Sequence, residues 1–317
     1  MLARVVTKGA ATRRPILVTG SHRSGTTWIG QVLAADSSVA YIHEPFALSC
    51  RPGVFPYHIP FWFFSVPEPP PPELVSAYRD LLRFHYAFGA EMRAIESPSD
   101  VARMIRDAAR FALFRVQKRR PLIKDPLALL SADWIARSFD CSVIVSTRHP
   151  VAFVSSLLRL GWRIDFANLR NQQQLMQGLL KDSEEDVIEG GRVGADDPLL
   201  EAAYLWKILH RVIARYREER PEWIFLRYED LARGPLKGFE SIFAKFGLQY
   251  DGKVQKMIEF LSGGDNPPDR ATDARVTRVA SSAYSEQSLR RLSAEDCARV
   301  RSVVAPVSHL FYSDEEW

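Results

Sequence analysis

The chain has 317 residues, 46% hydrophobic and 25% charged, which is ordinary for a globular protein and excludes wholesale disorder. Its 42 basic and 38 acidic residues leave a net charge of only +4, so the composition does not favour a nucleic-acid partner. Three widely spaced cysteines indicate a reducing compartment and provide neither a disulfide framework nor a metal site. Residues 1–15 lack the apolar core of a signal peptide, and no stretch approaches the ~20 apolar residues that cross a bilayer. We therefore expect a cytoplasmic protein.

From the N-terminus onward, short apolar runs alternate with helical patterns. Uniformly apolar runs are typical of strands buried on both faces, and their alternation with helices is typical of a parallel sheet. We expect an α/β fold of three layers, a central parallel sheet flanked by helices, with ligands at the carboxyl ends of the strands. The expected strands lie within 15–20, 39–46, 121–126, 141–150 and 223–231, and the expected helices begin near Gly25, Ser131, Val151 and Pro235 or cover 286–304.

Two segments do not fit this alternation. Residues 51–72 are rich in proline and aromatic residues and lead into a helix-like stretch at 73–93, and a second, polar segment covers 162–198. We expect a single domain, residues 1–317, in which insertions at about 51–120 and 162–198 form a lid or a wall of an acceptor pocket. A surface insertion is the alternative, and the four consecutive prolines taken alone favour it.

The segment 20–28 reads GSHRSGTTW and directly follows an apolar run. A loop between a buried strand and a helix surrounds an anion with backbone N–H groups and the positive end of the helix. Gly20 and Gly25 have the spacing of a nucleoside-triphosphate P-loop, but Thr26 stands where that motif has its lysine, and Arg23 is the nearest cation. The glycines alone would also fit a tight strand-to-helix connection.

The string Arg23-Ser24-Gly25-Thr26-Thr27-Trp28 resembles the 5′-phosphosulfate loop of sulfotransferases whose donor is 3′-phosphoadenosine 5′-phosphosulfate (PAPS). The resemblance implies a P-loop-like fold, donor binding by this string, 3′-phosphoadenosine 5′-phosphate (PAP) as product, and transfer without a metal. It also implies that Arg23 stabilises the leaving phosphate. Trp28 would either stack on the adenine or only pack in the core.

A second motif begins where the apolar run at 141–147 ends. Arg148 follows this run, and Ser156 comes eight residues later in the expected helix, which resembles the 3′-phosphate motif of the same family. A guanidinium can hold a phosphate through two hydrogen bonds, and a hydroxyl can add a third. The resemblance places Tyr228 of LRYEDL near the adenine, although a half-buried strand-end aromatic is equally compatible. It also places Arg275 and Arg278 in a basic loop over the 3′-phosphate.

The acceptor is expected to be a hydroxyl, which needs a general base. Glu44 in YIHEPF resembles the proposed base in the His-Glu-Pro of the glycan-directed branch. The cytosolic phenol and steroid branch has a histidine after its lysine, and Lys124-Asp125-Pro126 lacks it, so the resemblance is closer to the carbohydrate and tyrosylprotein branch. Glu44 could instead pair with a neighbouring arginine, and Lys124 could assist the sulfuryl group or pair with Asp125. The weaker base candidates are His43, His58 and His85.

These motifs together predict a PAPS-dependent sulfotransferase that acts on a hydroxyl of a saccharide, a glycolipid or a small metabolite. A nucleotide kinase or NTPase is the alternative enzyme, disfavoured by Thr26 in the lysine position and by Arg148 where an acid would bind metal. A non-catalytic binding protein of the same fold is disfavoured because Arg23, Glu44 and Arg148 occur together. The sequence indicates neither the particular acceptor nor the oligomeric state.

Overall fold

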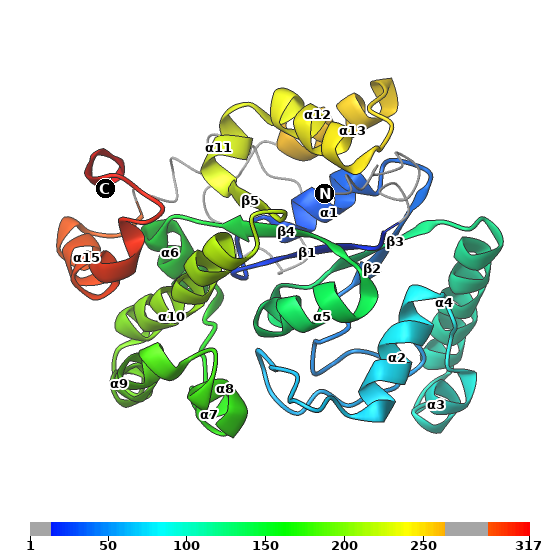
Figure 1. Ribbon diagram of the computed structural model, residues 1–317, viewed down its shortest axis with the longest axis horizontal. Coiled ribbons are helices and arrows are strands. Elements are labelled where there is room, and N and C mark those ends of the chain that lie inside the picture. The colour runs from blue at the N-terminus through cyan, green and yellow to red at the C-terminus, as the bar shows by residue number, and fades with distance from the viewer. Residues whose placement is uncertain (1–13, 264–290) are drawn as a thin grey trace, which may run out of the picture.

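The computed structural model describes residues 14–263 and 291–317. These residues include a five-stranded sheet with the order β2-β3-β1-β4-β5, in which every neighbouring pair of strands is parallel (Figure 1). The predicted parallel sheet is therefore confirmed, with β1 at its centre. The strands are β1 (Ile16–Gly20), β2 (Val39–His43), β3 (Arg120–Lys124), β4 (Ser142–Thr147) and β5 (Ile224–Arg227).

Helices cover both faces of the sheet and bury a core on each. Successive strand side chains point to opposite faces, so Ile16 and Val18 lie in one core and Leu17 in the other. The predicted three-layer α/β fold is thus confirmed. The smaller core contains α1 (Thr26–Leu33), α11 (Tyr228–Arg233), α12 (Pro235–Phe246) and α13 (Gly252–Ser262), which Figure 1 shows above the sheet.

The larger core lies against the opposite face, below the sheet in Figure 1. Its longest helix is α10 (Pro198–Glu219), which the sequence analysis did not single out. It packs against α6 (Pro150–Leu160), α9 (Glu184–Gly194) and α15 (Ala294–Ser308). The other elements on this side are α2 (Pro72–Leu82), α3 (Phe88–Arg93), α4 (Pro98–Val116), α5 (Ala132–Phe139), α6 (Pro150–Leu160), α7 (Ala167–Arg170), α8 (Gln173–Gln177), α9 (Glu184–Gly194) and α15 (Ala294–Ser308), with the 3₁₀ helices η2 (Pro126–Ser131), η3 (Lys181–Ser183) and η4 (Asp314–Glu316). No helix in the described ranges is long and apolar enough to cross a membrane.

Several predicted boundaries differ from the structure. The run at 39–46 leaves the sheet after His43, because Glu44 adopts a left-handed φ of 43°. The run at 223–231 ends as a strand at Arg227, and Tyr228 already opens α11. The helix-like stretch at 73–93 is two helices, because Phe84, with φ of 55°, interrupts it.

The last predicted helix, 286–304, is also shifted. The described part begins at Ala294, where the Ser293 side chain accepts a hydrogen bond from the Asp296 N–H and caps the helix. Residues 286–290 lie outside the described residues. Helices α1, α5, α6 and α12 begin within one residue of their predicted starts, because a glycine, serine or proline marks each of them.

Candidate functional site

The predicted site residues gather at one edge of the sheet. Because the five strands are parallel, their carboxyl ends meet there. The loop 20–28 follows β1, Glu44 follows β2, Lys124 ends β3, Arg148 follows β4 and Tyr228 follows β5. The chain leaves β1 toward β3 and β2 on one side and later adds β4 on the other, so the loop lies where the strand order reverses. Ligands of open α/β sheets bind at such a point.

Two glycines give the loop its path. Gly20 has φ of 136°, and a Cβ there would collide with the backbone of Ser146 on β4. Gly25 has φ of 85°, and its Cβ would lie 2.5 Å from the Tyr228 ring. Both positions combine a left-handed conformation with a close approach, so only glycine fits them.

Hydrogen bonds fasten the loop to the end of β4. The Ser21 N–H donates to the Ser146 carbonyl at 3.2 Å, and the Ser146 hydroxyl donates to the Ser24 carbonyl at 2.6 Å. The Arg148 guanidinium Nη1 donates to the Arg23 carbonyl at 2.8 Å. The loop is therefore held in one conformation before any ligand binds.

The N-terminus of α1 is suited to an anion. Within the described residues no side chain caps this helix at Gly25, and its first turn contains no acid. The first N–H groups of a helix have no partner within it, and together with the helix dipole they attract negative charge. Thr26 is buried and Thr27 half-buried in this first turn. Trp28 packs edge-on against Phe239 at 5.1 Å and against Tyr228 at 5.9 Å between ring centres.

The two predicted phosphate motifs meet in space. Arg23 Nε donates a hydrogen bond to Ser156 Oγ at 3.0 Å. The Ser156 hydroxyl accepts this bond and keeps its own proton for a further acceptor. Arg148 is only 3% exposed, and its guanidinium carbon lies 5.0 Å from the Tyr228 ring centre. Arg23, which follows β1, and Arg148, which follows β4, therefore lie close together beside the N-terminus of α1.

Two buried residues that the sequence analysis missed hold Arg148 in place. Trp206 of α10 donates its indole N–H to the Arg148 carbonyl at 2.8 Å and stacks on His210 at 3.8 Å. Glu229 of α11 accepts from the His149 N–H at 2.9 Å, and burial raises the pKa of this carboxyl. The sequence carried no signal for these contacts, since they join α10 and α11 to the end of β4.

Glu44 and Lys124 form an ion pair at the ends of β2 and β3. The Lys124 side chain is 2% exposed and that of Glu44 is 25% exposed, so the carboxylate is the accessible member. His43 Nε2 lies 3.8 Å from the second carboxylate oxygen of Glu44. The expected alternatives are corrected here, because the partner of Glu44 is a lysine rather than an arginine, and Lys124 pairs with Glu44 rather than with Asp125.

Asp125 instead holds the backbone around this pair. Its carboxyl group accepts from the N–H groups of Phe46 at 2.6 Å, Leu127 at 3.0 Å and Ala128 at 3.3 Å. Burial, followed by the charge of Glu44, raises the pKa of Asp125 to about 7. The carboxyl group thereby ties the turn after Glu44 to η2.

The segments predicted as a lid or wall meet beside the loop. His22 is buried, with ring centres of Phe63 at 5.5 Å, Phe153 at 4.9 Å and Trp162 at 6.2 Å. Burial lowers the pKa of His22 to about 3, with a further contribution from Arg23. The guanidinium carbon of Arg23 lies 5.7 Å from the Trp162 ring centre. Both segments thus contact the loop through aromatic side chains.

Amide side chains of the second segment fasten it to the first. Three of them accept hydrogen bonds from backbone N–H groups of residues 62–68, and because two segments far apart in sequence are joined at three points, they form one wall. The pairs are Trp62 with Asn168 at 2.9 Å, Ser65 with Gln172 at 2.8 Å and Glu68 with Gln174 at 2.7 Å.

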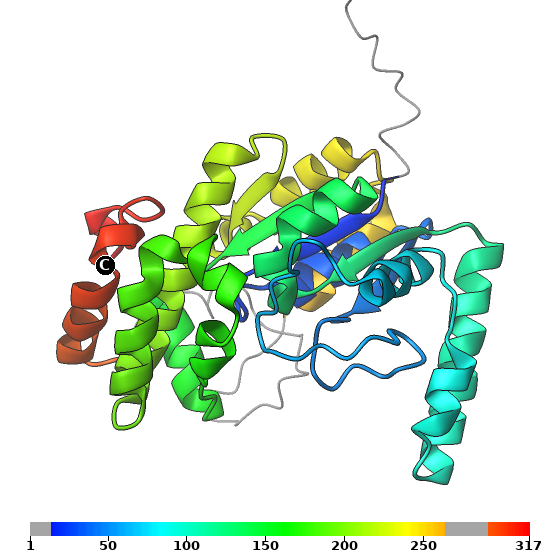
Figure 2. The ribbon, with the colours of Figure 1, turned by 60° about the horizontal axis from the view of Figure 1, so that its bottom comes forward.

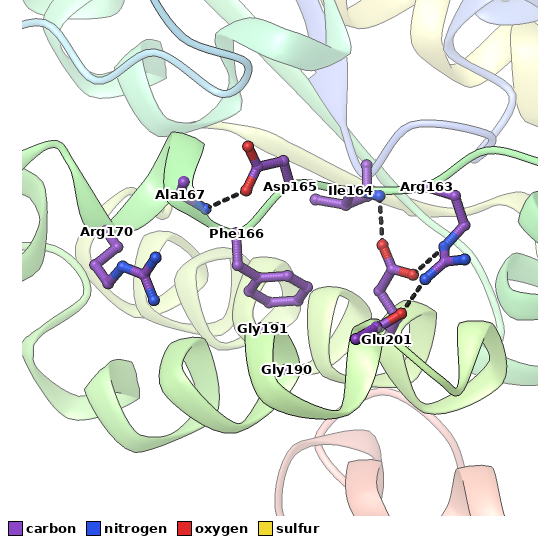
Figure 3. A pocket seen from close by; sticks show the side chains of 11 residues that line it. Arg163, Ile164, Asp165, Phe166, Ala167, Arg170, Gly190, Gly191 and Glu201 are labelled. Carbon is purple, nitrogen blue, oxygen red and sulfur yellow. Dashed lines mark hydrogen bonds and ion pairs between the residues drawn. The ribbon is translucent and has the colours of Figure 1, made fainter.

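A hollow of about 300 Å³ lies farther along the second segment, between residues 163–170 and helices α9 and α10 (Figure 3). Several of its polar groups are already engaged: Arg163 pairs with Glu201, and the Ile164 N–H donates to Glu201 at 2.5 Å. None of the loop residues 20–28 lines it. The hollow is therefore separate from the strand-end cluster.

Two further predictions concern the basic loop at Arg275 and Arg278 and the transfer without a metal. Arg275 and Arg278 lie outside the described residues. Within residues 14–263 and 291–317, no group of three or more histidine, cysteine or acidic side chains could hold a metal ion.

A parallel sheet with this glycine loop between β1 and α1 defines a P-loop-like α/β protein. The model of the sulfotransferase family matches residues 15–252, and the chain belongs to that family. It is therefore a sulfotransferase, an enzyme that transfers a sulfuryl group. Carbohydrate sulfotransferase 5 of Mus musculus is 23% identical over 303 residues, which cover 85% of this chain and 73% of the mouse protein.

Solved sulfotransferases resemble the chain at low identity. The sulfotransferase domain from the curacin biosynthetic pathway is 13% identical with a TM-score of 0.46, covering 92% of this chain and 97% of the domain. Mycobacterium avium STF9 is 16% identical with a TM-score of 0.42, covering 95% and 77%. Mouse SULT7A1, solved with PAP, is 12% identical with a TM-score of 0.40, covering 93% and 84%.

Proposed function

We propose that this sulfotransferase uses PAPS as donor and a hydroxyl of a saccharide, a glycolipid or a small metabolite as acceptor. The observation that carries the proposal is the contact between Arg23 and Ser156, which unites two motifs far apart in the chain beside the uncapped N-terminus of α1. A nucleotide with phosphate groups at both its 5′ and 3′ positions needs two such anion sites close together.

In this proposal the loop binds the 5′ end of the donor, and residues at and beyond the end of β4 bind its 3′-phosphate. Ser24, Gly25, Thr26 and Thr27 bind the 5′-phosphosulfate through N–H groups and hydroxyls, and Arg148 and Ser156 bind the 3′-phosphate. The remaining donor contacts are assigned to Trp28 and Tyr228 near the adenine and to Arg275 and Arg278 over the 3′-phosphate.

The chemistry follows from where charge develops. PAPS, when bound, supplies the activated sulfuryl group and a phosphate leaving group. Arg23 is preorganised to stabilise negative charge on that phosphate, because its backbone is fixed by Arg148 and its side chain by Ser156. Glu44 removes the acceptor proton, and Lys124 beside it keeps the carboxylate oriented and assists the transferring group.

The acceptor site in this proposal lies between Glu44 and the wall formed by residues 55–68 and 162–174. Half-buried aromatic side chains of that wall, including Trp62 and Trp162, provide flat apolar surface of the kind that stacks on sugars. Similarity to a mouse carbohydrate sulfotransferase supports a glycan or a glycolipid ahead of a small phenol.

A thermal-shift titration without metal tests the donor. PAP should raise the unfolding temperature, with about 2.7 kcal/mol of stabilisation at a ligand concentration of about one hundred times Kd, whereas ATP with Mg²⁺ should have little effect. The Arg148→Ala variant is the matched control, because it should lose most of the PAP shift. A larger shift with ATP and Mg²⁺ than with PAP would show that the donor site is a nucleoside-triphosphate site instead.

A further inference from the structure

Helices α3 and α4 expose much of the large apolar surface of the described chain. Six of the twelve exposed large hydrophobic side chains lie on these two helices. Figure 2 shows the teal α4 projecting beyond the rest of the molecule at the right, with α3 at its tip. Patches of this kind on otherwise charged surfaces mark interaction sites. The six are Phe88 (52% exposed), Met92 (62%), Val101 (37%), Ile105 (60%), Leu113 (49%) and Val116 (77%).

Three of the four exposed large apolar side chains of α4 form one stripe, and Leu113 lies at its border. Val101, Ile105 and Val116 are separated by four and eleven residues, which are close to whole turns of an α-helix, so they lie on one face. Phe111 and Phe114 point the other way and are buried in the larger core. The helix therefore has two apolar faces, and only one of them is covered by the protein.

Arginines border the exposed stripe. At 100° per residue, Arg106 and Arg110 lie along one edge and Arg115 along the other. Arg110 and Arg115 form no ion pair with any described residue. The acidic Glu91 and Asp107 are buried and both pair with Arg51, and Asp107 also pairs with Arg106 at 3.0 Å. The outer face of α4 is thus both apolar and cationic.

We propose that the outer face of α3 and α4 docks on an anionic lipid surface. A helix with an apolar stripe and arginine borders is suited to lie in the headgroup region, because the arginines reach anionic headgroups while the stripe enters the acyl boundary. A second copy of the chain fits less well, since a self-complementary contact would bring the arginine borders of both copies together. The proposal goes beyond sulfuryl transfer and does not depend on its donor.

Docking at this face would hold the strand-end cluster near the lipid surface. Glu91 of α3 accepts from the Gly53 N–H at 2.7 Å and pairs with Arg51. Arg51 and Gly53 come shortly after the turn that begins at Glu44. The projecting helices are therefore anchored to the same loop that carries the proposed base.

Cosedimentation of the full chain with vesicles tests the proposal. One set of vesicles contains phosphatidylcholine alone, and the other also contains phosphatidylglycerol. Binding is expected only to the second set and should weaken as salt rises. It should fall about tenfold or more in Ile105→Ser with Val116→Ser, and again in Arg110→Glu with Arg115→Glu. The two variants remove different attractions, so a folding defect in one leaves the other as a test.

Matched controls use exposed residues elsewhere on the molecule. Ile188→Ser with Met257→Ser removes two exposed apolar side chains from α9 and α13, and Lys253→Glu with Lys256→Glu reverses two exposed charges on α13. Both controls should bind vesicles like the wild type. The proposal is overturned if the wild type ignores anionic vesicles, if the α4 variants bind as well as the controls, or if light scattering finds a dimer that Ile105→Ser with Val116→Ser dissociates.

Discussion

At the scale of single residues, Arg148 and Ser156 are both almost fully buried, and each forms a hydrogen bond with Arg23 of the loop. Arg23 connects them, because its carbonyl accepts from Arg148 and its side chain donates to Ser156. The three residues therefore form one connected hydrogen-bonded group. The contribution of each can be separated through affinity for PAP.

Arg148→Ala and Ser156→Ala should both weaken PAP binding. The arginine variant should lose about 1.5–3 kcal/mol, because hydrogen bonds to charged groups are the stronger ones, and the serine variant about 0.5–1.5 kcal/mol. Calorimetry measures both. Ser155→Ala, a buried neighbour on the same helix, is the control and should bind PAP normally. Unchanged affinity in both test variants would remove the 3′-phosphate assignment.

Glu44→Gln should lower kcat by ~10²–10⁴ while PAP affinity and folding stay close to the wild type. Glutamine keeps an oxygen that can accept from Lys124 but cannot take a proton. The acid limb of the pH–rate profile should disappear with the base. His43→Gln is the neighbouring control and should keep that limb. If Glu44→Gln remains active with its acid limb intact, the base lies elsewhere, and Asp125, His58 and His85 are the next candidates.

At the scale of elements, the wall beside the loop is held together by side-chain amides, which accept hydrogen bonds from backbone N–H groups. Gln172 is 7% exposed, accepts from the Ser65 N–H and donates to the Phe63 carbonyl at 3.2 Å. Phe63 in turn packs on His22 of the loop. Gln172 therefore connects the second segment to Phe63, the residue of the first segment that packs on the loop.

Gln172→Ala should raise the acceptor KM and leave PAP affinity unchanged. It should also cost about 1–3 kcal/mol of stability, because a buried N–H and a buried carbonyl lose their partners. Initial-rate kinetics with varied acceptor, together with calorimetry of PAP, separates the two sites. Gln173→Ala, exposed and adjacent, is the control. Equal acceptor KM values in the two variants would show that the wall does not position the acceptor.

At the scale of the whole molecule, buried histidines set the response to acid. Burial lowers the pKa of His22 and His210 to about 3 and that of His149 to about 4. All three stay neutral in the folded protein, whereas the unfolded chain takes up protons near pH 6.5. Stability from these groups is therefore lost as pH falls below 6.5. Asp125 and Glu229, whose pKa values are raised, work in the opposite direction, whereas the lowered pKa values of Asp36 and Glu316 add to the loss of stability in acid.

The free energy of unfolding should consequently fall between pH 6.5 and pH 4, and His22→Phe should remove up to about 1.4 kcal/mol per pH unit of that slope. Phenylalanine keeps an aromatic ring among Phe63, Phe153 and Trp162 but cannot be protonated. Denaturant unfolding at several pH values measures the slope. His58→Phe, at an exposed position, should not change it. The same slope in His22→Phe and the wild type would contradict a buried neutral His22.

The sequence by itself determined the parallel α/β sheet, the edge at which the predicted site residues gather and the glycine loop at 20–28. These features follow from local patterns, such as apolar runs, glycine spacing and an arginine eight residues before a serine. Where strands end was less well determined: β5 stops at Arg227 because Tyr228 closes against Gly25 of the loop.

The tertiary structure alone decided which side chains meet. Arg23 and Ser156 are 133 positions apart, and Glu44 and Lys124 are 80 apart. The sequence analysis named an arginine as a possible partner of Glu44. The partner is Lys124 instead, because β2 and β3 are neighbouring strands. The amide contacts of Gln172 and the indole contact of Trp206 with Arg148 had no local pattern at all. Such pairings depend on the order of strands and the packing of helices, which short-range sequence patterns do not encode.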